Sequence, residues 1–452
     1  ACALSVSVPY SVVIASENNS NTVNTYKLDD VNVDATKDEE VVNPYITGGD
    51  VQVIRREVIE KHNYTTIVDA LKTIPGIQVS TPGYKGGEYG YAGYNTEVSI
   101  NGENNIIILV DGRRVDNDAN TYAGTKARVN ISTLPGINNV EQVEVIKGTG
   151  SSIYGSDSAG GVINIVTRKG SKQPKTTIDI ASGSWGRHNY ALSHTGSSED
   201  GSIQYAASLS RQMSGDSQYQ DVYTGKSETY SNTGFRDENA SFNIKKDFDK
   251  KHSLELTYNH SYEKAFYPIT APDYRYYSSF LNGTMATVNP LTHRYTGLNS
   301  SAPGYRNIFL YDAWLGSYDE TLSNNIDLKY VFGKTDELAE SYFRVYKNYT
   351  RYNTTDYSSI WNVPYPYLSE FLPAAKSSGN FHSDIEEVIG TALQMAKHTG
   401  KNSLIAGIKL RKSKYEYHDS SSSYESSRNA FDVYFQDKIK ISEKFTTTPG
   451  FN

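Results

Sequence analysis

The chain has 452 residues, of which 37% are hydrophobic and 21% are charged, with a formal net charge of -7. This balance excludes a bundle of transmembrane helices, because each such helix needs about 20 apolar residues in a row and the longest compact run is Ile106–Val110. The acidic balance argues against a nucleic-acid partner, whose binding depends on neutralising phosphates. The length predicts two or more domains, and 37 tyrosines with 35 glycines predict strands and turns.

Residues 1–16 carry no charge and resemble the rear of a secretory signal without its Met and basic start. We expect them to be a signal-peptide remnant and the chain to be cut from a longer parent at both ends; a disordered apolar leader is the alternative. The single cysteine, Cys2, excludes an intramolecular disulfide and any multi-cysteine metal site. Residues 17–43 are polar and acidic, which predicts a flexible arm.

Residues 44–170 have the pattern of a compact α+β domain. Thr66 and Asp69 have the spacing of a helix start, and an apolar face follows until Pro75 ends the helix. A second short helix is expected at Glu57–His62. Short strands are expected at Val51–Ile54, Ile77–Val79, Val98–Ile100, Ile106–Val110, Val143–Ile146 and Val162–Val166, with glycine-rich turns between them.

Residues 171–452 alternate apolar and polar side chains with a period of two. Leu209, Ile326 and Phe431 lie in such segments, of which about eleven can be counted. Each strand therefore has one apolar and one polar face. A soluble sandwich turns the apolar face to a core, whereas a membrane barrel turns it to lipid.

The connections favour the barrel. Short turns near 197–201, 247–251, 333–336 and 399–402 alternate with longer stretches near 212–236, 264–322, 350–382 and 415–428. Outer-membrane barrels have short periplasmic turns and long outer loops in this order. We predict an antiparallel transmembrane β-barrel, incomplete and roughly half of a 22-stranded one, because lumens of that width need a plug.

Residues 44–170 resemble the plug domain of TonB-dependent outer-membrane receptors, of the siderophore-receptor type. Asn101 and Lys147 depart from the family pattern, which commonly has arginine at both positions, so a role for arginine at position 101 does not carry over. The resemblance rests on these segments, in the family's order: Asp69–Val79, Val98–Gly102, Ile106–Arg113, Val140–Gly148, Ser151–Gly155 and Gly160–Thr167.

The resemblance implies a TonB box in the arm, which pairs as an added strand with the periplasmic protein TonB. An extended segment with unpaired backbone groups suits that pairing, whereas a solvated acidic linker is the alternative. The residues expected to contact TonB are Asp29, Asp30, Val31, Asn32, Val33, Asp34, Ala35 and Thr36.

The resemblance also implies a receptor in the outer membrane of a Gram-negative-type bacterium, in contact with outer-membrane lipid, that imports a scarce nutrient. Aromatic rings with arginines suit a bulky anionic iron chelate, so a ferric siderophore is the leading ligand, with haem or cobalamin as alternatives. Tyrosine also forms the girdles of any barrel. The candidate ligand-binding residues are Tyr84, Tyr89, Tyr91, Tyr94, Arg113, Arg114, Tyr276 and Arg351.

Catalysis has no support in the sequence. Gly148–Gly155 lacks the lysine of a phosphate-binding loop, no H-E-x-x-H or G-x-S-x-G motif occurs, and the nine histidines lack ligand spacing. We expect no enzyme activity, no cofactor and no metal site. Two further alternatives are a passive surface barrel or adhesin and a soluble β-sandwich binding protein.

Overall fold

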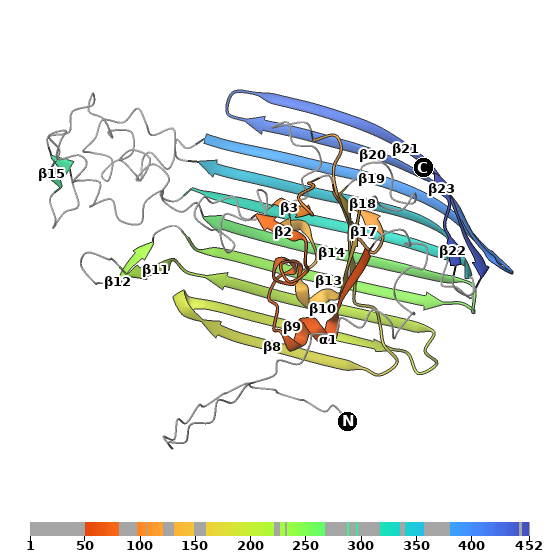
Figure 1. Cartoon of the computed structure of the whole chain (residues 1–452). Helices are drawn as coiled ribbons and strands as arrows, with labels where there is room; N and C mark the ends of the chain where they lie inside the picture. Colours follow the sequence, from red (N-terminus) through yellow and green to blue (C-terminus); the bar gives the residue numbers. More distant parts are fainter. Residues whose placement is uncertain are drawn as a thin grey trace, which may run out of the picture.

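The computed structural model describes residues 50–80, 97–104, 106–120, 131–148, 160–220, 227–230, 233–266, 287–288, 295–296, 317–334, 340–356, 380–442 and 445–451. An N-terminal domain lies against a large curved antiparallel sheet, here called the wall (Figure 1). The predicted signal remnant and arm, residues 1–16 and 17–43, lie outside the described residues.

The N-terminal domain is built on a five-stranded sheet in the order β1-β6-β7-β4-β5. Strands β4 and β7 are parallel, and β6 pairs antiparallel with both β1 and β7. All six predicted short strands and both predicted helices are present. The elements are β1 (Asp50–Arg55), α1 (Arg56–Lys61), α2 (Ile67–Leu71), β2 (Ile77–Ser80), β3 (Glu97–Ile100), β4 (Ile106–Val110), β5 (Arg113–Arg114), the 3-10 helices η2 (Ile131–Thr133) and η3 (Ile137–Asn139), β6 (Val140–Lys147) and β7 (Gly161–Thr167).

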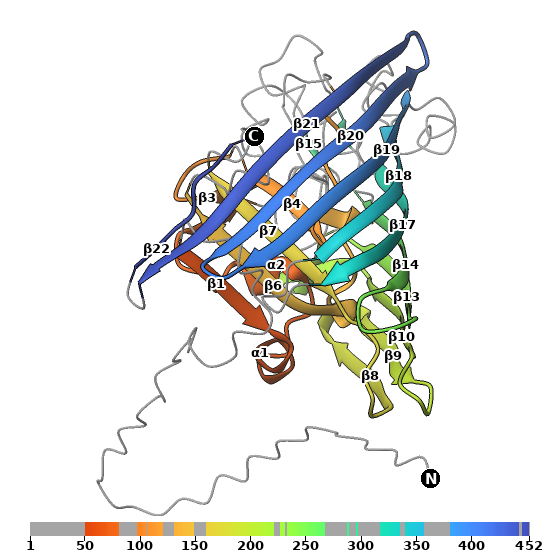
Figure 2. The same ribbon diagram turned by 90° about the vertical axis from the view of Figure 1, so that its right-hand side faces the viewer.

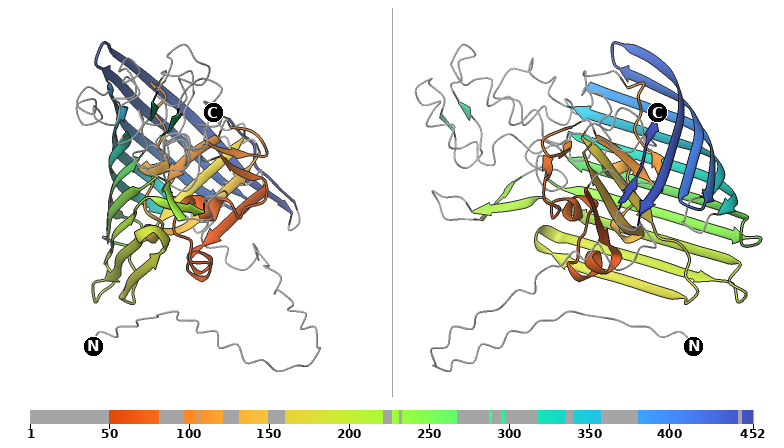
Figure 3. Two further views of the ribbon diagram at one scale, coloured as in Figure 1. Left: turned by 90° about the vertical axis from the view of Figure 1, so that its left-hand side faces the viewer. Right: turned by 45° about the vertical axis from the view of Figure 1, so that its right-hand side comes forward.

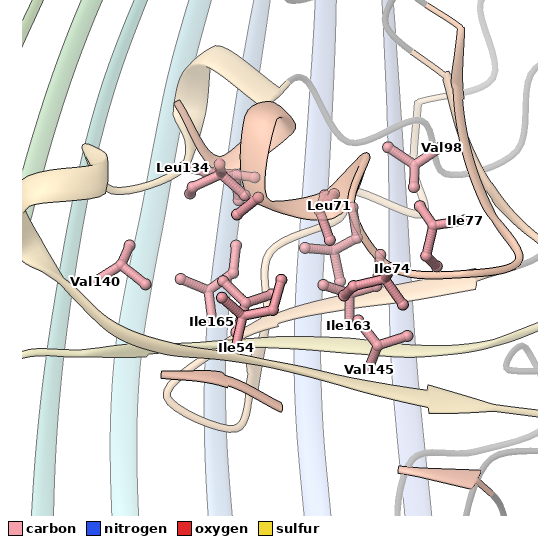
Figure 4. Close-up of a cluster of buried hydrophobic side chains, with 14 of the residues drawn as sticks. Ile54, Leu71, Ile74, Ile77, Val98, Leu134, Val140, Val145, Ile163 and Ile165 are labelled. Carbon is pink, nitrogen blue, oxygen red and sulfur yellow. The ribbon is translucent and has the colours of Figure 1, made fainter. Parts of the chain in front are cut away.

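One face of this sheet carries the domain's hydrophobic core. Leu71 and Ile74 from the region of α2 pack over Val145, Ile163 and other aliphatic side chains of the central strands (Figure 4). These side chains are almost fully removed from water. Because Val and Ile residues alternate along β6 and β7, the opposite face of the same strands is left to meet the wall.

Helix α2 begins with the predicted cap. The backbone N–H of Asp69 donates to the Thr66 hydroxyl over 3.1 Å, and the backbone N–H of Thr66 donates to the Asp69 carboxylate over 2.9 Å. This reciprocal pair satisfies backbone donors that a helix start leaves without partners. Helix α2 is only five residues long, so its position depends on the cap and on its buried face.

The wall joins eleven strands in the order β22-β21-β20-β19-β18-β17-β14-β13-β10-β9-β8, and β23 also pairs with β21. Its long strands, of up to 20 residues, reach well past the roughly ten-residue segments expected from the sequence. The strands are β8 (Lys175–Gly183), β9 (Arg187–Ser197), β10 (Ile203–Ser214), β13 (Phe235–Asp247), β14 (Ser253–Phe266), β17 (Tyr318–Lys334), β18 (Glu340–Asp356), β19 (Asn380–Thr399), β20 (Asn402–Asp419), β21 (Ser423–Ser442), β22 (Phe445–Thr447) and β23 (Gly450–Phe451).

Shorter elements lie between these strands. The 3-10 turn η4 (Ser184–Gly186) joins β8 to β9. Two small hairpins, β11 (Ser217–Gln220) with β12 (Ser227–Tyr230) and β15 (Thr287–Val288) with β16 (Tyr295–Thr296), occur within the long connections after β10 and β14.

The predicted alternation of apolar and polar side chains along the strands is confirmed, and each kind of side chain faces its own side of the wall. Leu209, Ile326 and Phe431 point away from the N-terminal domain and are 58%, 47% and 64% exposed. Their neighbours in the strands, such as Ser208 and Asp327, point toward the concave side and are buried. A wall that exposes its apolar side chains and hides its polar ones is the arrangement of a sheet surrounded by lipid.

One predicted connection is wrong. The long stretch expected near 415–428 is a three-residue turn between β20 and β21, and Lys414, Tyr415, Glu416 and Tyr417 continue the strand alternation instead of forming a loop. Asp419 closes the turn by accepting hydrogen bonds from the backbone N–H groups of the serines at 421 and 422. The serines of this region are compatible with strand ends and tight turns.

The N-terminal domain lies on the concave side of the wall. Figure 2 shows it behind the ribbons of β18 to β21, and the left view of Figure 3 shows the wall curving around it. Among the described residues, no helix is long and apolar enough to cross a membrane.

The cap of α2 yields a first prediction. We expect Thr66→Ala to lower the free energy of unfolding of the N-terminal domain by about 1 kcal/mol, because the N–H of Asp69 loses its acceptor. Hydrogen exchange of Ile67–Leu71, measured on the intact protein, reports the change.

The matched control is Thr66→Ser, which keeps the hydroxyl and should leave exchange near the wild-type rate. Equal exchange in the alanine and serine variants would show that packing alone holds the helix.

Candidate functional site

The candidate site is the interface between the N-terminal domain and the wall. Its centre is apolar, because side chains from one face of the five-stranded sheet pack against two side chains of the wall. The domain contributes Ile107, Leu109, Ile146 and Val162, and the wall contributes Ile405 and Tyr434. The Tyr434 hydroxyl donates to Oε1 of Gln394 over 2.8 Å, so its polar end has a partner inside the wall.

The turn after β4 makes hydrogen bonds both to the rest of the N-terminal domain and to the wall. Asp111 and Gly112 adopt positive φ values of 50° and 74°, which aspartate and glycine tolerate better than most residues. The Asp111 carboxylate accepts from the backbone N–H and the hydroxyl of Thr167 over 2.9 and 2.7 Å. Its carbonyl oxygen accepts from Nη2 of Arg344 in β18 over 2.9 Å, and Arg344 also pairs with Asp327 of β17 at 3.3 Å.

Lys169 joins the same turn to a second part of the wall. Its ammonium contacts the Glu255 carboxylate of β14 and lies 3.5 Å from a carboxylate oxygen of Asp111. Burial by itself lowers the pKa of Lys169, but the two carboxylates outweigh it and hold the pKa above its usual value. The lysine is therefore kept charged where the domain leads into β8.

A buried carboxylate lies beside this turn. Glu144 of β6 is 2% exposed and accepts from Nδ2 of Asn164 over 2.8 Å and from Nε2 of Gln142. Burial raises the pKa of Glu144, the hydrogen bonds offset part of the rise, and the nearby negative charge of Asp111 adds to it. Asn164 in turn accepts from the backbone N–H of Gly112 over 3.0 Å, which links the carboxylate to the turn.

Arg113 is directed into the wall. It is 4% exposed, donates to Oδ1 of Asn348 in β18, and its guanidinium carbon lies 5.3 Å from the ring centre of Tyr346. Burial lowers the pKa of Arg113, opposed by the negative charge of Asp327. A buried guanidinium with an amide and an aromatic ring as partners acts as an anchor for the domain.

Arg114 begins a chain of ion pairs that crosses to β20. Its guanidinium contacts the carboxylate of Asp116, with Nε 2.8 Å from Oδ1, and Asp116 lies 3.5 Å from Nη1 of Arg411. Burial raises the pKa of Asp116, but Arg114 and Arg411 outweigh it, so the net pKa is below its usual value.

Residues 116–120, here called the docking segment, contact the wall along their whole length. Nδ2 of Asn117 donates to the carbonyl of Lys414 over 3.0 Å, and Nδ2 of Asn120 donates to Oε1 of Glu386 over 2.7 Å. Between them, Ala119 packs against Tyr415 and Tyr417.

Asp118 is the charged centre of the docking segment. It accepts from Nη2 of Arg411 over 2.8 Å and from the Ser413 hydroxyl over 2.5 Å, and Arg428 lies 3.8 Å away. Arg411 is 8% exposed and Arg428 is 65% exposed, so the first is part of a buried contact and the second lies at its edge.

Of the three predicted ligand residues that lie in the described part of the chain, the structure brings two together. Arg113 and Arg114 lie side by side at the domain–wall interface, whereas Arg351 lies on the outer face of β18, because it has the same strand parity as the exposed Phe343 and Val345. The other predicted residues lie outside the described part of the chain: Tyr84, Tyr89, Tyr91, Tyr94, Tyr276 and the segment from Asp29 to Thr36.

Sequence reasoning missed the docking segment. Asp116 and Asp118 follow Arg113 and Arg114 closely, and this run of alternating charges was the available signal. Their partner Arg411 is almost 300 residues away, and no local pattern distinguishes it from the outward-facing lysines nearby. Within the described residues, no group of three or more His, Cys, Asp or Glu side chains is placed to hold a metal ion.

Comparison with known families decides what the N-terminal domain is. Residues 45–162 match the family model described as the TonB-dependent Receptor Plug Domain. This segment is a plug domain. The resemblance stated from the sequence is therefore confirmed, and the Asp111–Gly112 turn, Arg113, Arg114 and the docking segment all belong to the plug.

Curated relatives match over the plug region. An "Iron-regulated outer membrane virulence protein" of Vibrio cholerae is 35% identical over 159 residues, which are 33% of this chain and 23% of the relative. The "Vitamin B12 transporter BtuB" of Vibrio vulnificus is 34% identical over 134 residues, 29% of this chain and 20% of the relative. The matched region is thus about a quarter or less of each relative.

Solved receptor structures match over most of the chain. The ferric enterobactin receptor PfeA of Pseudomonas aeruginosa aligns with a TM-score of 0.60 at 17% identity, covering 88% of this chain and 57% of PfeA. The ferric yersiniabactin uptake receptor FyuA of Yersinia pestis aligns with a TM-score of 0.57 at 13% identity, covering 89% and 56%. The predicted fold class, a plug followed by an incomplete barrel-like antiparallel sheet, is confirmed at the level of the fold.

The docking segment yields a second prediction. We expect Arg411→Met to release residues 117–120 from the wall, because Asp118 loses its buried partner and keeps only a hydroxyl and a distant arginine. Amide hydrogen exchange of these residues in the intact protein should become at least about tenfold faster.

Arg428→Met is the matched control, since this exposed arginine should contribute little. The pH adds a second check through Asp116, whose pKa Arg114 and Arg411 hold below its usual value. Such a carboxyl stabilises the folded state above its unfolded pKa of about 3.9, and the contribution disappears as the pH falls through the lowered value. The difference between wild type and Arg411→Met should therefore shrink below about pH 4. Equal exchange in both methionine variants would contradict the assignment.

Proposed function

We propose that the chain is part of a TonB-dependent outer-membrane receptor that actively imports a scarce nutrient. The observation that carries the proposal is a plug domain fastened by ion pairs to the concave, polar face of a wall whose opposite face is apolar. A wall with this polarity belongs in lipid, and a plug on its polar side closes a passage through it. We place the protein in the outer membrane of a Gram-negative-type bacterium.

The proposed organisation has four parts. Residues 1–16 are the remnant of a signal peptide, residues 17–43 are a flexible arm, residues 44–170 are the plug and residues 171–452 are part of the barrel. In this proposal TonB binds Asp29–Thr36 as an added strand and pulls on the arm. The receptor makes and breaks no covalent bond, so it needs neither an enzyme site nor a cofactor.

The polar character of the plug–wall interface supports movement of the plug. Lys169, Arg344 and Arg411 hold it through hydrogen bonds and ion pairs, which water can replace when the contact opens. A large apolar interface would expose its surface to water on opening, at a cost proportional to its area. The small apolar patch around Tyr434 keeps that cost low.

A ferric siderophore is the proposed ligand class, with haem and cobalamin as the alternatives. The wall resembles receptors for ferric enterobactin and ferric yersiniabactin, and a curated relative of the plug is named as iron-regulated. Another relative of the plug is named as a vitamin B12 transporter, which supports cobalamin as an alternative ligand. Growth of cells on a panel of iron sources, with cobalamin uptake as a parallel assay, separates these ligands.

The proposed ligand site consists of the predicted tyrosines of the plug, its neighbouring arginines Arg113 and Arg114, and Tyr276. Both arginines already have partners: Asn348 and Tyr346 contact Arg113, and Asp116 pairs with Arg114. Arg351 is on the outer face of the wall, so its side chain does not face a ligand bound on the concave side.

The third prediction concerns energy coupling. Deletion of Asp29–Thr36 from the full-length protein should abolish uptake and leave ligand binding at the cell surface unchanged, because the ligand site and the TonB contact are separate. Uptake of radiolabelled ligand in cells with and without TonB measures this. Uptake that survives both the deletion and the loss of TonB would indicate a passive barrel.

The fourth prediction concerns the ligand site. Changing Tyr84, Tyr89, Tyr91 and Tyr94 together to alanine should weaken ligand binding about tenfold or more, because each stacked ring contributes about 0.5–1.5 kcal/mol. The same four positions changed to phenylalanine keep the rings and should bind nearly as well as wild type. Unchanged affinity in the alanine variant would remove these tyrosines from the site.

A further inference from the structure

The outer face of the wall contains a groove that the import function does not use. It lies across β8, β9, β10 and β13 and has a volume of about 510 Å³. Strand register places its apolar side chains opposite one another on the face that points away from the plug. They are Ile178, Ile180, Tyr190, Leu192 and Leu209, each between 44% and 73% exposed.

The groove ends in a group of charges on its loop side. Arg211 is the next outward residue after Leu209, three residues before β10 ends at Ser214. Glu238 lies opposite it on β13, with the two side chains 3.4 Å apart, and Arg236 also binds Glu238, at 2.5 Å. Two arginines thus share one carboxylate, which leaves one positive charge without a negative partner within this group.

Both arginines are about half exposed, at 48% and 47%, in contrast to the arginines that anchor the plug. The guanidinium carbon of Arg236 lies 5.8 Å from the ring centre of Tyr262, which orients this side chain along the wall. Nε of Arg211 lies 3.4 Å from Glu238 and the side chain is 48% exposed, so other N–H groups of its guanidinium are accessible to a ligand.

Two other outward-facing cations in the described part of the wall each have one carboxylate partner. Lys264 pairs with Glu320 at 3.1 Å, and Lys347 pairs with Glu387 at 3.3 Å. Neither of these pairs borders the groove. At the groove, by contrast, two arginines share one carboxylate beside an apolar surface.

We propose that this groove binds a membrane lipid with an anionic, phosphate-bearing headgroup. An acyl chain lies along Leu192 and Leu209, and the phosphate is held by the guanidinium groups of Arg211 and Arg236. A lipid-facing arginine is costly at the middle of a bilayer and nearly free at its surface, which fits the position of both residues near the strand ends. Guanidinium groups bind phosphate through paired hydrogen bonds, which favours an anionic headgroup over a zwitterionic one.

This inference rests on the proposed membrane location of the wall. Partition of the full-length protein into membranes tests that location separately: a protein that stays in water without detergent would contradict the proposed function. For a protein that does enter membranes, the lipid experiment tests the groove alone.

The experiment compares two lipids on the full-length receptor in nanodiscs. Phosphatidylglycerol, labelled on its acyl chain, is titrated against a background of phosphatidylcholine, and bound lipid is counted by native mass spectrometry. We expect wild type to retain phosphatidylglycerol in preference to phosphatidylcholine. Replacing Arg211 by alanine, or Arg236 by alanine, should each reduce that preference about fivefold, since a basic residue near the membrane surface contributes about that factor.

Two further variants separate charge from shape. Ala240→Phe fills the groove without changing its charge, since Ala240 lies on the outer face opposite Leu209, and it should reduce retention of both lipids. Lys347→Ala removes an outward cation elsewhere on the wall and should leave retention unchanged. Equal loss with Lys347→Ala, or no loss with the arginine variants, would overturn the proposal and leave only non-selective lipid contact.

Discussion

Several charged side chains of the plug have their partners on the wall, and these contacts set how the two parts fit together. Arg113 and Asp116 would be costly to bury alone, and Lys169 is partly buried. Each meets side chains from different wall strands: Asn348 and Tyr346 of β18, Arg411 of β20, and Glu255 of β14. The partners are spread over much of the wall, so one orientation of the plug satisfies them together.

Such an interface is better suited to specificity than to strength. Buried ion pairs contribute little net stability, because the attraction mainly offsets the loss of hydration, but removing one partner is costly. The plug is thereby held in a defined position by contacts that hydration can replace. This property agrees with a domain that closes a passage and must be displaced for a ligand to pass.

The wall is subject to a different constraint, because its two faces meet different surroundings. Its backbone groups are paired between neighbouring strands, and the period of two then sends Leu209 and Phe431 outward and Ser208 and Asp327 inward. The same parity explains why Arg351 and Arg344, on one strand, serve different sides of the wall. It also places the groove beside Arg211 on the face away from the plug.

Most elements of the plug, the cap of α2 and the two-faced strands of the wall can be predicted from the sequence alone. These features depend on residues a few positions apart, through helix caps, turn glycines and alternation, so they can be read locally. Which charges meet, by contrast, depends on how distant parts of the chain pack together. Asp118 and Arg411 are 293 residues apart, and their contact exists only because the curvature of the wall brings β20 to the plug. The length of β20 and β21 was likewise settled by strand pairing, which continues through serine-rich segments whenever a neighbouring strand offers hydrogen-bond partners.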